Sequence, residues 1–381
     1  MICREELCTG CAACQTACPV TCITMRASET GFMLPHIDQD RCIHCKRCEE
    51  VCPAGKVPIK ANTDAVWAMR NCNAKERHCS SSGGIFSPLA RYVLRSGGVV
   101  YGAQQFSALD VRHVRVASLQ ELPALRGSKY IQSNIGMSYR LVQEDLEYGR
   151  KVMFVGTPCQ VVGLKAFLNR EWESLLTVDL VCHGVISPLA VRTYLNKENF
   201  PSENTFINWR DKSGGKGWHG FSLTLTANYS TRQRIFARTT LGEFFINNLF
   251  LRPSCYTCQN KANHSLADIT LGDYWGIENS HPELDDNAGT SVVIAHTQKG
   301  CGALEAIRGE TEAVSSTFEQ AAKENWALYS HAETEVDWTE AFALLKSDGL
   351  DAVWKKYLRK PLWRRAGSKI KRTLCKMLRD S

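Results

Sequence analysis

Two runs of four cysteines near the start of the chain restrict its fold more than any other feature. Each run has the spacing Cys-x2-Cys-x2-Cys-x3-Cys and is followed by proline; the members are Cys8, Cys11, Cys14 and Cys18, then Cys42, Cys45, Cys48 and Cys52. Thiolates at steps of three along a tight loop can bind one iron–sulfur cube, while the fourth, before proline, reaches the other cube. The spacing therefore predicts two 4Fe-4S clusters, one bound by Cys8, Cys11, Cys14 and Cys52 and the other by Cys42, Cys45, Cys48 and Cys18.

A zinc site is the main alternative for these runs. Zinc takes four ligands, commonly as two pairs, and two complete four-cysteine runs are hard to explain that way. Cys3 and Cys22 fall outside the spacing, and we expect neither to bind a cluster. The segment "GFMLPHIDQD" between the runs reads as a hairpin and loop. We expect residues 1–60 to form a small ferredoxin-like domain that its clusters hold folded.

The length and cysteine content of the chain indicate its broad class. With 381 residues, 44% of them hydrophobic, the chain is long enough for two or three packed units. Eighteen cysteines would suggest disulfides in a short secreted protein, but the start "MICREELCTG" lacks the apolar run of a signal peptide. No segment is apolar over the length that spans a membrane. We therefore expect a reduced, cytoplasmic, metal-binding protein.

Residues 352–381 carry eleven Lys and Arg against one Asp, a local charge of +10. Because the formal net charge is +7, the rest of the chain is mildly acidic, at −3. We expect residues 331–381 to form a helical basic tail. Most such tails are solvated helices, and contact with a membrane surface or an acidic partner is the alternative. The acidic body contains no recognisable nucleic-acid module, so we expect no nucleic-acid partner.

The middle of the chain alternates strands and helices. The segments "VVYGAQQF", "KVMFVG" and "LLTVDLVC" read as strands, and "LVQEDLEYGR" and "HGVISPLAVRTYL" as helices. The stretch "ANTDAVWAMRNCNAKERHC" before them reads as a connection of mixed polarity. In "SSSGGIFSPLARYVLRSGG" a Ser/Gly cluster leads into a helix, whose first amides suit a phosphate or a flat ring; an ordinary helix cap is the simpler interpretation.

Four further cysteines are expected to meet at one edge of a parallel sheet. Cys159 and Cys182 each follow a strand at a strand-to-helix turn, and neighbouring parallel strands end at the same edge. Cys255 and Cys258 form a Cys-x2-Cys pair further on. A third 4Fe-4S cluster bound by these four thiols would continue the path of the first two. A reversible disulfide between Cys255 and Cys258 is the main alternative, and tetrahedral zinc is the next.

Six segments carry a family resemblance; in order they are "SSSGGIFS", "LRGSKYIQSNIG", "GTPCQ", "DLVCHG", "CYTCQNKANHSLADITLGDYWG" and "NAGTSVVI". Together they resemble the beta-subunit family of coenzyme F420 hydrogenases and dehydrogenases, over roughly residues 1–300. The resemblance implies a flavin enzyme whose cluster ligands match the four cysteines just named. It implies flavin contacts at Ser82, Gly83, Gly84, Lys129, Tyr130, Gly289, Thr290 and Ser291, and FAD rather than FMN.

These residue types suit a bound flavin. Adjacent glycines permit close approach of the backbone to a ring, and Lys129 can neutralise a pyrophosphate or a reduced flavin. No G-x-G-x-x-G occurs, so a standard Rossmann site for FAD or NAD is not expected. His183 and His219 are candidate catalytic acid–base groups, although a structural role is more common for a histidine taken singly.

We therefore predict an α+β and α/β chain. It has a bacterial-type ferredoxin domain (1–60), a flavin-binding part (61–150), an α/β domain with the third cluster and the flavin pocket (151–330), and a helical tail (331–381). The predicted function is that of an FAD- and iron–sulfur-dependent oxidoreductase, which exchanges electrons with a protein such as ferredoxin and acts on an unidentified small molecule. The alternative is a non-catalytic electron-transfer subunit that serves a partner enzyme.

Overall fold

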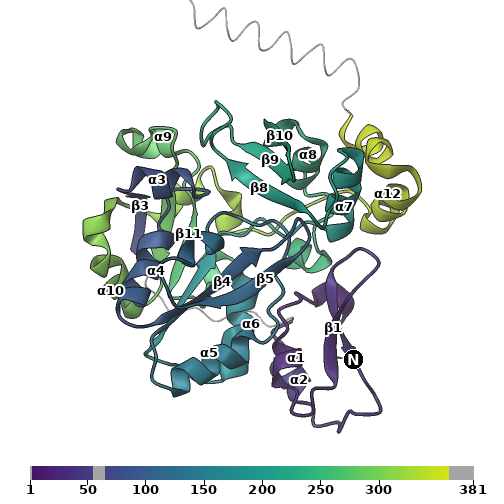
Figure 1. The fold of residues 1–381 in the computed structure, drawn as a ribbon, viewed down its shortest axis with the longest axis horizontal. Helices are drawn as coiled ribbons and strands as arrows, with labels where there is room; N and C mark the ends of the chain where they lie inside the picture. Colours follow the sequence, from purple (N-terminus) through teal and green to yellow (C-terminus); the bar gives the residue numbers. More distant parts are fainter. Residues whose placement is uncertain (1, 55–64, 360–381) are drawn as a thin grey trace, which may run out of the picture. The chain divides into compact units, whose positions relative to one another are not determined.

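The computed structural model describes residues 2–54 and 65–359 (Figure 1). By its internal contacts the chain divides into two units, Met1–Thr334 and Glu335–Ser381. Residue 60, where we expect the first domain to end, and residues 360–381 of the expected basic tail lie outside the described residues. Within the described ranges, no helix is both long and apolar enough to cross a membrane.

An eight-stranded sheet forms the centre of the first unit. In sheet order its strands are β13 (Thr311–Ser316), β3 (Ala65–Asn71), β12 (Ser291–Ala295), β11 (Ile269–Asp273), β7 (Leu175–Leu180), β6 (Val152–Gly156), β4 (Val99–Gln105) and β5 (Val111–Val116). Strands β11, β7, β6 and β4 pair in parallel, and the other pairs are antiparallel. The carboxyl ends of the parallel strands therefore share one edge, where Cys159 and Cys182 follow β6 and β7.

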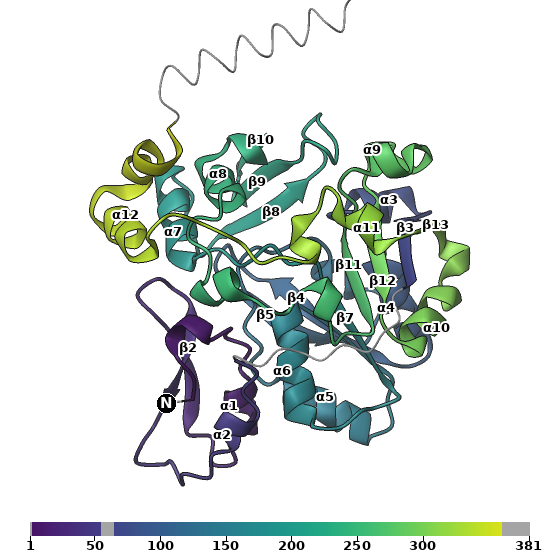
Figure 2. The ribbon, with the colours of Figure 1, turned by 180° about the vertical axis from the view of Figure 1, so that it is seen from behind.

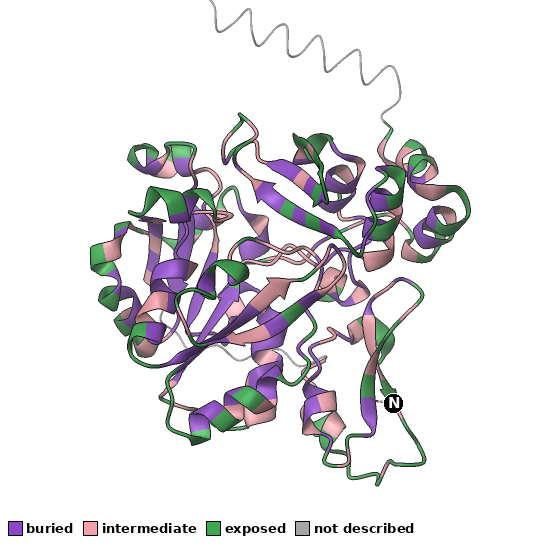
Figure 3. Cartoon of the chain, viewed as in Figure 1, coloured by how far each residue is buried: buried purple, intermediate pink, exposed green. Residues whose placement is uncertain are grey.

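Helices cover both faces of this sheet, whose strands are mostly buried (Figures 2 and 3). On one face, α4 (Phe86–Arg95) and α10 (Gln298–Ala306) pack against alternate strand residues such as Val100 and Met153. On the other face, α5 (Ser138–Glu147) and α6 (Pro158–Leu168) pack against Val99 and Phe154, and α9 (Ile277–Ser280) and α11 (Phe318–Ala322) cover β3 and β12. Successive side chains of a strand point to opposite faces, which explains the nearly continuous hydrophobic runs.

Two smaller sheets complete the first unit. In the N-terminal segment, β1 (Ile23–Ala27) and β2 (Met33–Ile37) form a hairpin beside the short helices α1 (Ala13–Ala17) and α2 (Arg47–Glu50). Between α7 (Pro188–Lys197) and α8 (Thr240–Ile246), an antiparallel sheet contains β8 (Thr205–Asp211), β9 (Ser222–Ala227) and β10 (Ser230–Ile235). The predicted mixture of α+β and α/β architecture is confirmed.

The stretch expected to be a mere connection contains a strand of the central sheet. It forms β3 and then α3 (Ala74–His78), so that prediction was wrong. Val66 and Ala68 pack on one face of the sheet and Met69 on the other. Polar residues lie at the end of the strand, where the Arg70 guanidinium pairs with Glu312 at 2.6 Å, and in α3. A strand buried on both faces has no alternating pattern for sequence inspection to detect.

Both strand-to-helix turns that follow β6 and β7 have capped helices. Thr157 and Gln160 form a capping box at the start of α6, and Pro158 occupies its first turn. At the start of α7, Ser187 Oγ accepts a hydrogen bond from Ala190 N. These caps satisfy amide groups that have no partner within the helix. Cys159 is therefore held in the first turn of a helix with a fixed beginning.

The N-terminal segment packs on helix α6. Cys11 belongs to the same buried cluster as Val161 of that helix. A Cβ atom built on Gly163 would lie 2.9 Å from Cys11 Cβ and 3.0 Å from Cys11 Sγ, so only glycine permits this approach. The Arg140 guanidinium of α5 adds a hydrogen bond of 3.1 Å to the Cys18 carbonyl oxygen. The cysteine-rich segment is thus attached at the helix that carries Cys159 in its first turn.

The second unit contains α12 (Trp338–Val353) and the π-helical turn η9 (Trp354–Leu358). The Asp337 side chain caps α12 by accepting a hydrogen bond from Glu340 N, and Gly349, with φ +76°, interrupts the helix. Lys356 Nζ donates to Glu340 Oε1 at 2.5 Å. The described part of the expected C-terminal tail is helical from Trp338 to Leu358, as predicted.

Replacing Gly163 with valine should weaken the packing of the N-terminal segment on α6. The new side chain would overlap Cys11 and would meet the Tyr139 hydroxyl, which lies 3.0 Å from the ideal Cβ position. Overpacking of this kind costs about 1–3 kcal/mol. We expect a lower midpoint of thermal unfolding, measured by circular dichroism on anaerobically purified protein.

Gly302→Ala on α10 is the matched control, because a Cβ atom at Gly302 meets nothing within 4 Å. Alanine favours a helix over glycine by up to about 1 kcal/mol, so this variant should unfold at an equal or higher temperature. A Gly163→Val variant as stable as the wild type would contradict the close packing of Cys11 on α6.

Candidate functional site

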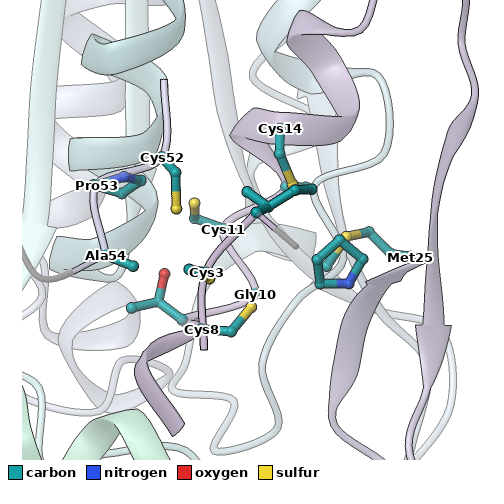
Figure 4. Close-up of a pocket in the computed structure, with 13 residues that line it drawn as sticks. Cys3, Cys8, Gly10, Cys11, Cys14, Met25, Cys52, Pro53 and Ala54 are labelled. Carbon is teal, nitrogen blue, oxygen red and sulfur yellow. The ribbon is translucent and has the colours of Figure 1, made fainter. Parts of the chain in front are cut away.

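The four thiols predicted for the first cluster lie around one cavity (Figure 4). Cys8 and Cys11 precede α1, Cys14 lies within it, and Cys52 follows α2. The sulfur atoms of Cys11 and Cys52 point toward one another across the cavity. Pro35 of the hairpin lines another side, so the surroundings are largely apolar. Four thiolates in an apolar cavity are the ligand set of an iron–sulfur cube.

Cys3 lines the same cavity, although it lies outside the cysteine spacing. A hydrogen bond from Cys3 lowers the pKa of Cys8 to about 6, which favours the thiolate at neutral pH. Burial raises the pKa of Cys11 to about 11, so a metal ion must displace the proton of that thiol. No feature of the sequence pattern indicates the proximity of Cys3, because its position depends on how the first residues fold back.

The second predicted set lies partly at the surface. Cys18 and Cys22 are buried with their sulfur atoms 3.4 Å apart, and Cys42 and Cys48 pack against them. Cys45 is exposed. Cys22, which the spacing leaves out, is therefore next to a predicted ligand. The loop that carries the second run faces solvent, whereas the first run faces α6.

The four cysteines predicted for the third cluster line a second cavity; they are Cys159, Cys182, Cys255 and Cys258. Cys159 is in the first turn of α6, and Cys182 is two residues beyond the end of β7. Cys255 lies in the helical turn η4 (Pro253–Thr257), and Cys258 follows it directly. The parallel pairing of β6 with β7 brings the first two thiols together, and the loop of η4 supplies the other two.

These four cysteines are half-buried, and three of their thiols have raised pKa values. Burial raises the pKa of Cys182 and that of Cys255 to about 12. Burial, and then repulsion from Cys258, also raises the pKa of Cys159. Cys159, Cys182 and Cys255 are therefore protonated at neutral pH without a metal, and metal binding must release their protons. All four are free cysteines in the structure.

Two buried cations also line this cavity, Arg252 and Lys261. Arg252 is 2% exposed and Lys261 4%. Lys261 Nζ donates a hydrogen bond of 2.8 Å to the Cys182 carbonyl oxygen. Sequence reasoning missed both residues. The available signal was their position, three residues before and three residues after the Cys-x2-Cys pair.

The two candidate catalytic histidines lie in different surroundings. His183 lines the cavity of the four thiols, bonds to Asn248 Oδ1 at 2.6 Å and stacks on Phe245. Burial lowers its pKa to about 4, so His183 is neutral at physiological pH. His219 is at the surface, where its Nε2 is 2.9 Å from Asp285 Oδ1. Only His183 therefore belongs to the thiol cavity.

Two of the three expected flavin segments meet around the Lys212 ammonium group. Lys212 Nζ donates to the carbonyl oxygens of Arg77, Ser82 and Ala288, at 2.7–2.8 Å. A Cβ atom on Gly289 would lie 2.8 Å from the Ser82 carbonyl oxygen. The neighbouring contacts are those of Ser82 Oγ with the Thr290 carbonyl and of Gly83 N with Ser291 Oγ, and Gly84 has φ +81°. The glycines thus permit close contact between the two chain segments.

The segment that contains Lys129 and Tyr130 joins this group. Ser128 N donates to Ser81 Oγ at 2.7 Å. Lys129 Nζ donates to two backbone carbonyl oxygens, which leaves one of its three hydrogens for another acceptor. Arg210 NH1 pairs with Asp273 at 2.7 Å, while its buried Nε has no partner among the described residues. Lys129 and Arg210 therefore offer unused donors next to the Ser/Gly segment, which suits an anionic cofactor.

Comparisons with known proteins bear on the family resemblance and on the cysteine-rich N-terminal segment. Residues 149–320 match a family described as the C terminus of the beta subunit of coenzyme F420 hydrogenase/dehydrogenase, and residues 7–56 match the 4Fe-4S dicluster domain. These matches confirm the predicted resemblance to this family and the predicted 4Fe-4S clusters of the N-terminal segment. No curated protein matches the chain.

A solved structure, titled xenon derivatization of the F420-reducing [NiFe] hydrogenase complex from Methanosarcina barkeri, is similar to the chain. The identity is 18% and the TM-score 0.47, over 78% of this chain and 91% of the other.

Replacing Cys159 with serine should remove only the innermost cluster. We expect about twelve iron atoms per wild-type chain, which corresponds to three cubes, and about eight per variant chain. Iron and acid-labile sulfide are measured on protein purified without oxygen. The visible absorption of the two N-terminal clusters should remain.

Cys301→Ser is the control, because Cys301 is a half-buried free cysteine that packs against the core between the sheet and α10. It should keep about twelve iron atoms. A wild-type content of about eight would exclude the third cluster and would favour the thiol-disulfide alternative at Cys255 and Cys258.

Proposed function

We propose that this chain, whose residues 149–320 carry the C-terminal domain of the beta-subunit family, is an iron–sulfur flavoprotein oxidoreductase. It would pass electrons from its two N-terminal clusters by way of a third 4Fe-4S cluster to FAD and then to an unidentified small molecule. The observation that carries the proposal is the meeting of four thiols from three distant parts of the chain around one cavity, beside the N-terminal segment. Single-electron transfer is the chemistry that such clusters supply when they are bound.

The order of the thiol sites supports entry of electrons at the second N-terminal cluster. Its loop is at the surface, where Cys45 is exposed and Ile43 is 60% exposed. The first cluster's Cys11 packs instead on Gly163, one turn of α6 after Cys159. Four residues of an α-helix span about 6 Å, so the first and third thiol sites are close neighbours. A protein electron donor such as ferredoxin is the partner that fits this exposed loop.

The residues around Ser82 and Lys129 fit an FAD molecule by their chemistry. Lys129 and Arg210 have unused hydrogen-bond donors that suit the diphosphate or the anionic reduced ring. When bound, FAD supplies the conversion between single electrons and electron pairs. The role of this chain is to hold the cofactor between segments that Lys212 ties together. His183 would then be a positioning residue, since its neutral ring is fixed by Asn248.

Stacked rings connect the thiol cavity with the expected flavin segment. His183, adjacent to Cys182, stacks on Phe245 with ring centres 4.4 Å apart. Phe245 stacks on Tyr130 at 4.4 Å with an angle of 8° between the rings. Tyr130 is one of the residues expected to contact FAD. This contact series supports a short separation between the third cluster and the flavin.

The purified protein should oxidise chemically reduced ferredoxin when a suitable small-molecule acceptor is present, with no other protein added. The measurement is an anaerobic screen of acceptors, followed by ferredoxin absorption. The Cys159→Ser variant should lose this turnover while it keeps its flavin, because the innermost thiol site is broken. Inactivity of fully loaded protein with every acceptor would instead favour a non-catalytic electron-transfer role, in keeping with the beta-subunit family.

Replacing Lys129 with methionine should lower flavin content without loss of iron. Burial lowers the pKa of Lys129 to about 7, so its positive charge decreases as the pH rises through 7. Wild-type protein should therefore retain FAD more weakly at pH 8.5 than at pH 6, roughly in proportion to the charged fraction of one group. Flavin is measured after gel filtration at each pH.

Lys75→Met is the control for charge, because Lys75 is exposed on α3. It should bind FAD as the wild type does at both pH values. Equal flavin content in the Lys129 variant and the wild type would exclude Lys129 from the cofactor site.

A further inference from the structure

Arg252 lies between two of the thiol cavities. It directly precedes the turn η4 that carries Cys255, and it lines the cavity of the four inner thiols. Its guanidinium nevertheless reaches the N-terminal segment, where Nε donates to the Cys8 carbonyl oxygen at 2.7 Å and NH2 is 3.9 Å from Cys8 Sγ. NH2 also donates to the Met33 carbonyl oxygen at 2.7 Å. One side chain thus contacts a ligand of the first cluster and faces the site of the third.

The charge of Arg252 is enclosed without a carboxylate among these partners. Its remaining polar contact is NH1 with Gln132 Oε1 at 2.8 Å, and Phe32 lies beside the guanidinium at 5.3 Å. The side chain is 2% exposed. A Cβ atom on Gly10 would lie 2.7 Å from NH1, so the cysteine loop itself closes over the guanidinium. Burying a charge is costly unless an opposite charge compensates it.

Thiolates and clusters can supply that compensation. Arg252 NH2 lies 3.9 Å from Cys8 Sγ, and Arg252 lines the cavity that contains Cys255, so its charge is within electrostatic reach of both cavities. Adding an electron to a cluster makes it more negative, and a nearby buried cation stabilises the reduced form. Net charge and hydrogen bonds to the sulfur atoms are among the factors that set cluster potentials.

We propose that Arg252 is a shared cation that raises the reduction potentials of the first and third clusters relative to the second. The proposal rests on the proposed function, since it requires the three clusters. Arg252 is a positioning residue here. It bonds to the ligand Cys8 and to the loop around the first cluster, and its charge determines which cluster is reduced first. The second cluster would lie on the side of the N-terminal segment away from Arg252, so its reduction potential serves as the internal reference.

Arg252→Gln should lower the reduction potential of the first cluster, with a smaller fall for the third and none for the second. We expect at least a tenfold lower equilibrium constant for reduction, which is about 59 mV for one electron. The experiment is an anaerobic redox titration of the holoprotein followed by electron paramagnetic resonance, with iron content measured in parallel. Arg252→Lys keeps the charge and should stay within about threefold of the wild type.

Lys261→Met is the matched control for locality. Lys261 lines the inner cavity and bonds to the Cys182 carbonyl oxygen, so this variant should shift the third cluster and leave the first unchanged. The proposal is overturned if Arg252→Gln moves no potential, if Arg252→Lys falls as far as Arg252→Gln, or if all three clusters shift equally.

If Arg252→Gln does not retain its iron, Gln132→Ala takes its place. Gln132 bonds to both Arg252 and the Thr9 carbonyl oxygen, so its loss loosens the same contact while the charge stays. Unchanged potentials in this variant, together with near-wild-type potentials for Arg252→Lys, would support the proposal that the charge of Arg252 sets the potentials. A tenfold fall in Gln132→Ala would assign the effect to packing and overturn the proposal. Wild-type protein that contains no clusters when purified without oxygen would instead refute the proposed function itself.

Discussion

The contact between the N-terminal cysteine loop and helix α6 determines how the rest of the site is arranged. Gly163 lets Cys11 approach the helix to a distance that any side chain would prevent. The same helix carries Cys159 in its first turn, which the capped start after β6 holds at the edge of the sheet. Two thiol cavities therefore share one rigid element. Electron transfer benefits from such rigidity because neither site has to move to meet the other.

The charges around these cavities follow the same arrangement. Arg252 and Lys261 flank the Cys-x2-Cys pair and are both buried, although buried cations are normally avoided. Arg252 also ties the pair to Cys8. Metal sites depend on groups beyond the direct ligands, which orient the ligands and adjust potentials. In this chain Arg252 and Lys261 come from the loop that closes the second cavity, so under the proposal the folding of that loop also places the charges that adjust the cluster potentials.

Much of the fold and of the candidate site could be predicted from the sequence, with a few exceptions. The spacing of the two cysteine runs predicted the two N-terminal clusters. The apolar segments ending at Cys159 and Cys182 predicted two adjacent parallel strands. The strand β3 was missed because it is buried on both faces and so lacks alternation. Cys3 and Cys22 were set aside, yet each lies beside thiols of a predicted cluster. The roles assigned to the flavin segments stay predictions.

By itself, the sequence determined the features that depend on local geometry. The spacing of ligands along a loop, the hydrophobic strands and the capped helices follow from covalent geometry and from residues a few positions apart. Only the tertiary structure decided which distant groups meet. The approach of Arg252 to Cys8 joins residues 244 positions apart, and sheet order and packing, not any local pattern, bring them together. Long-range proximity of this kind is a property of the whole packed core, and so it is absent from any short stretch of the chain.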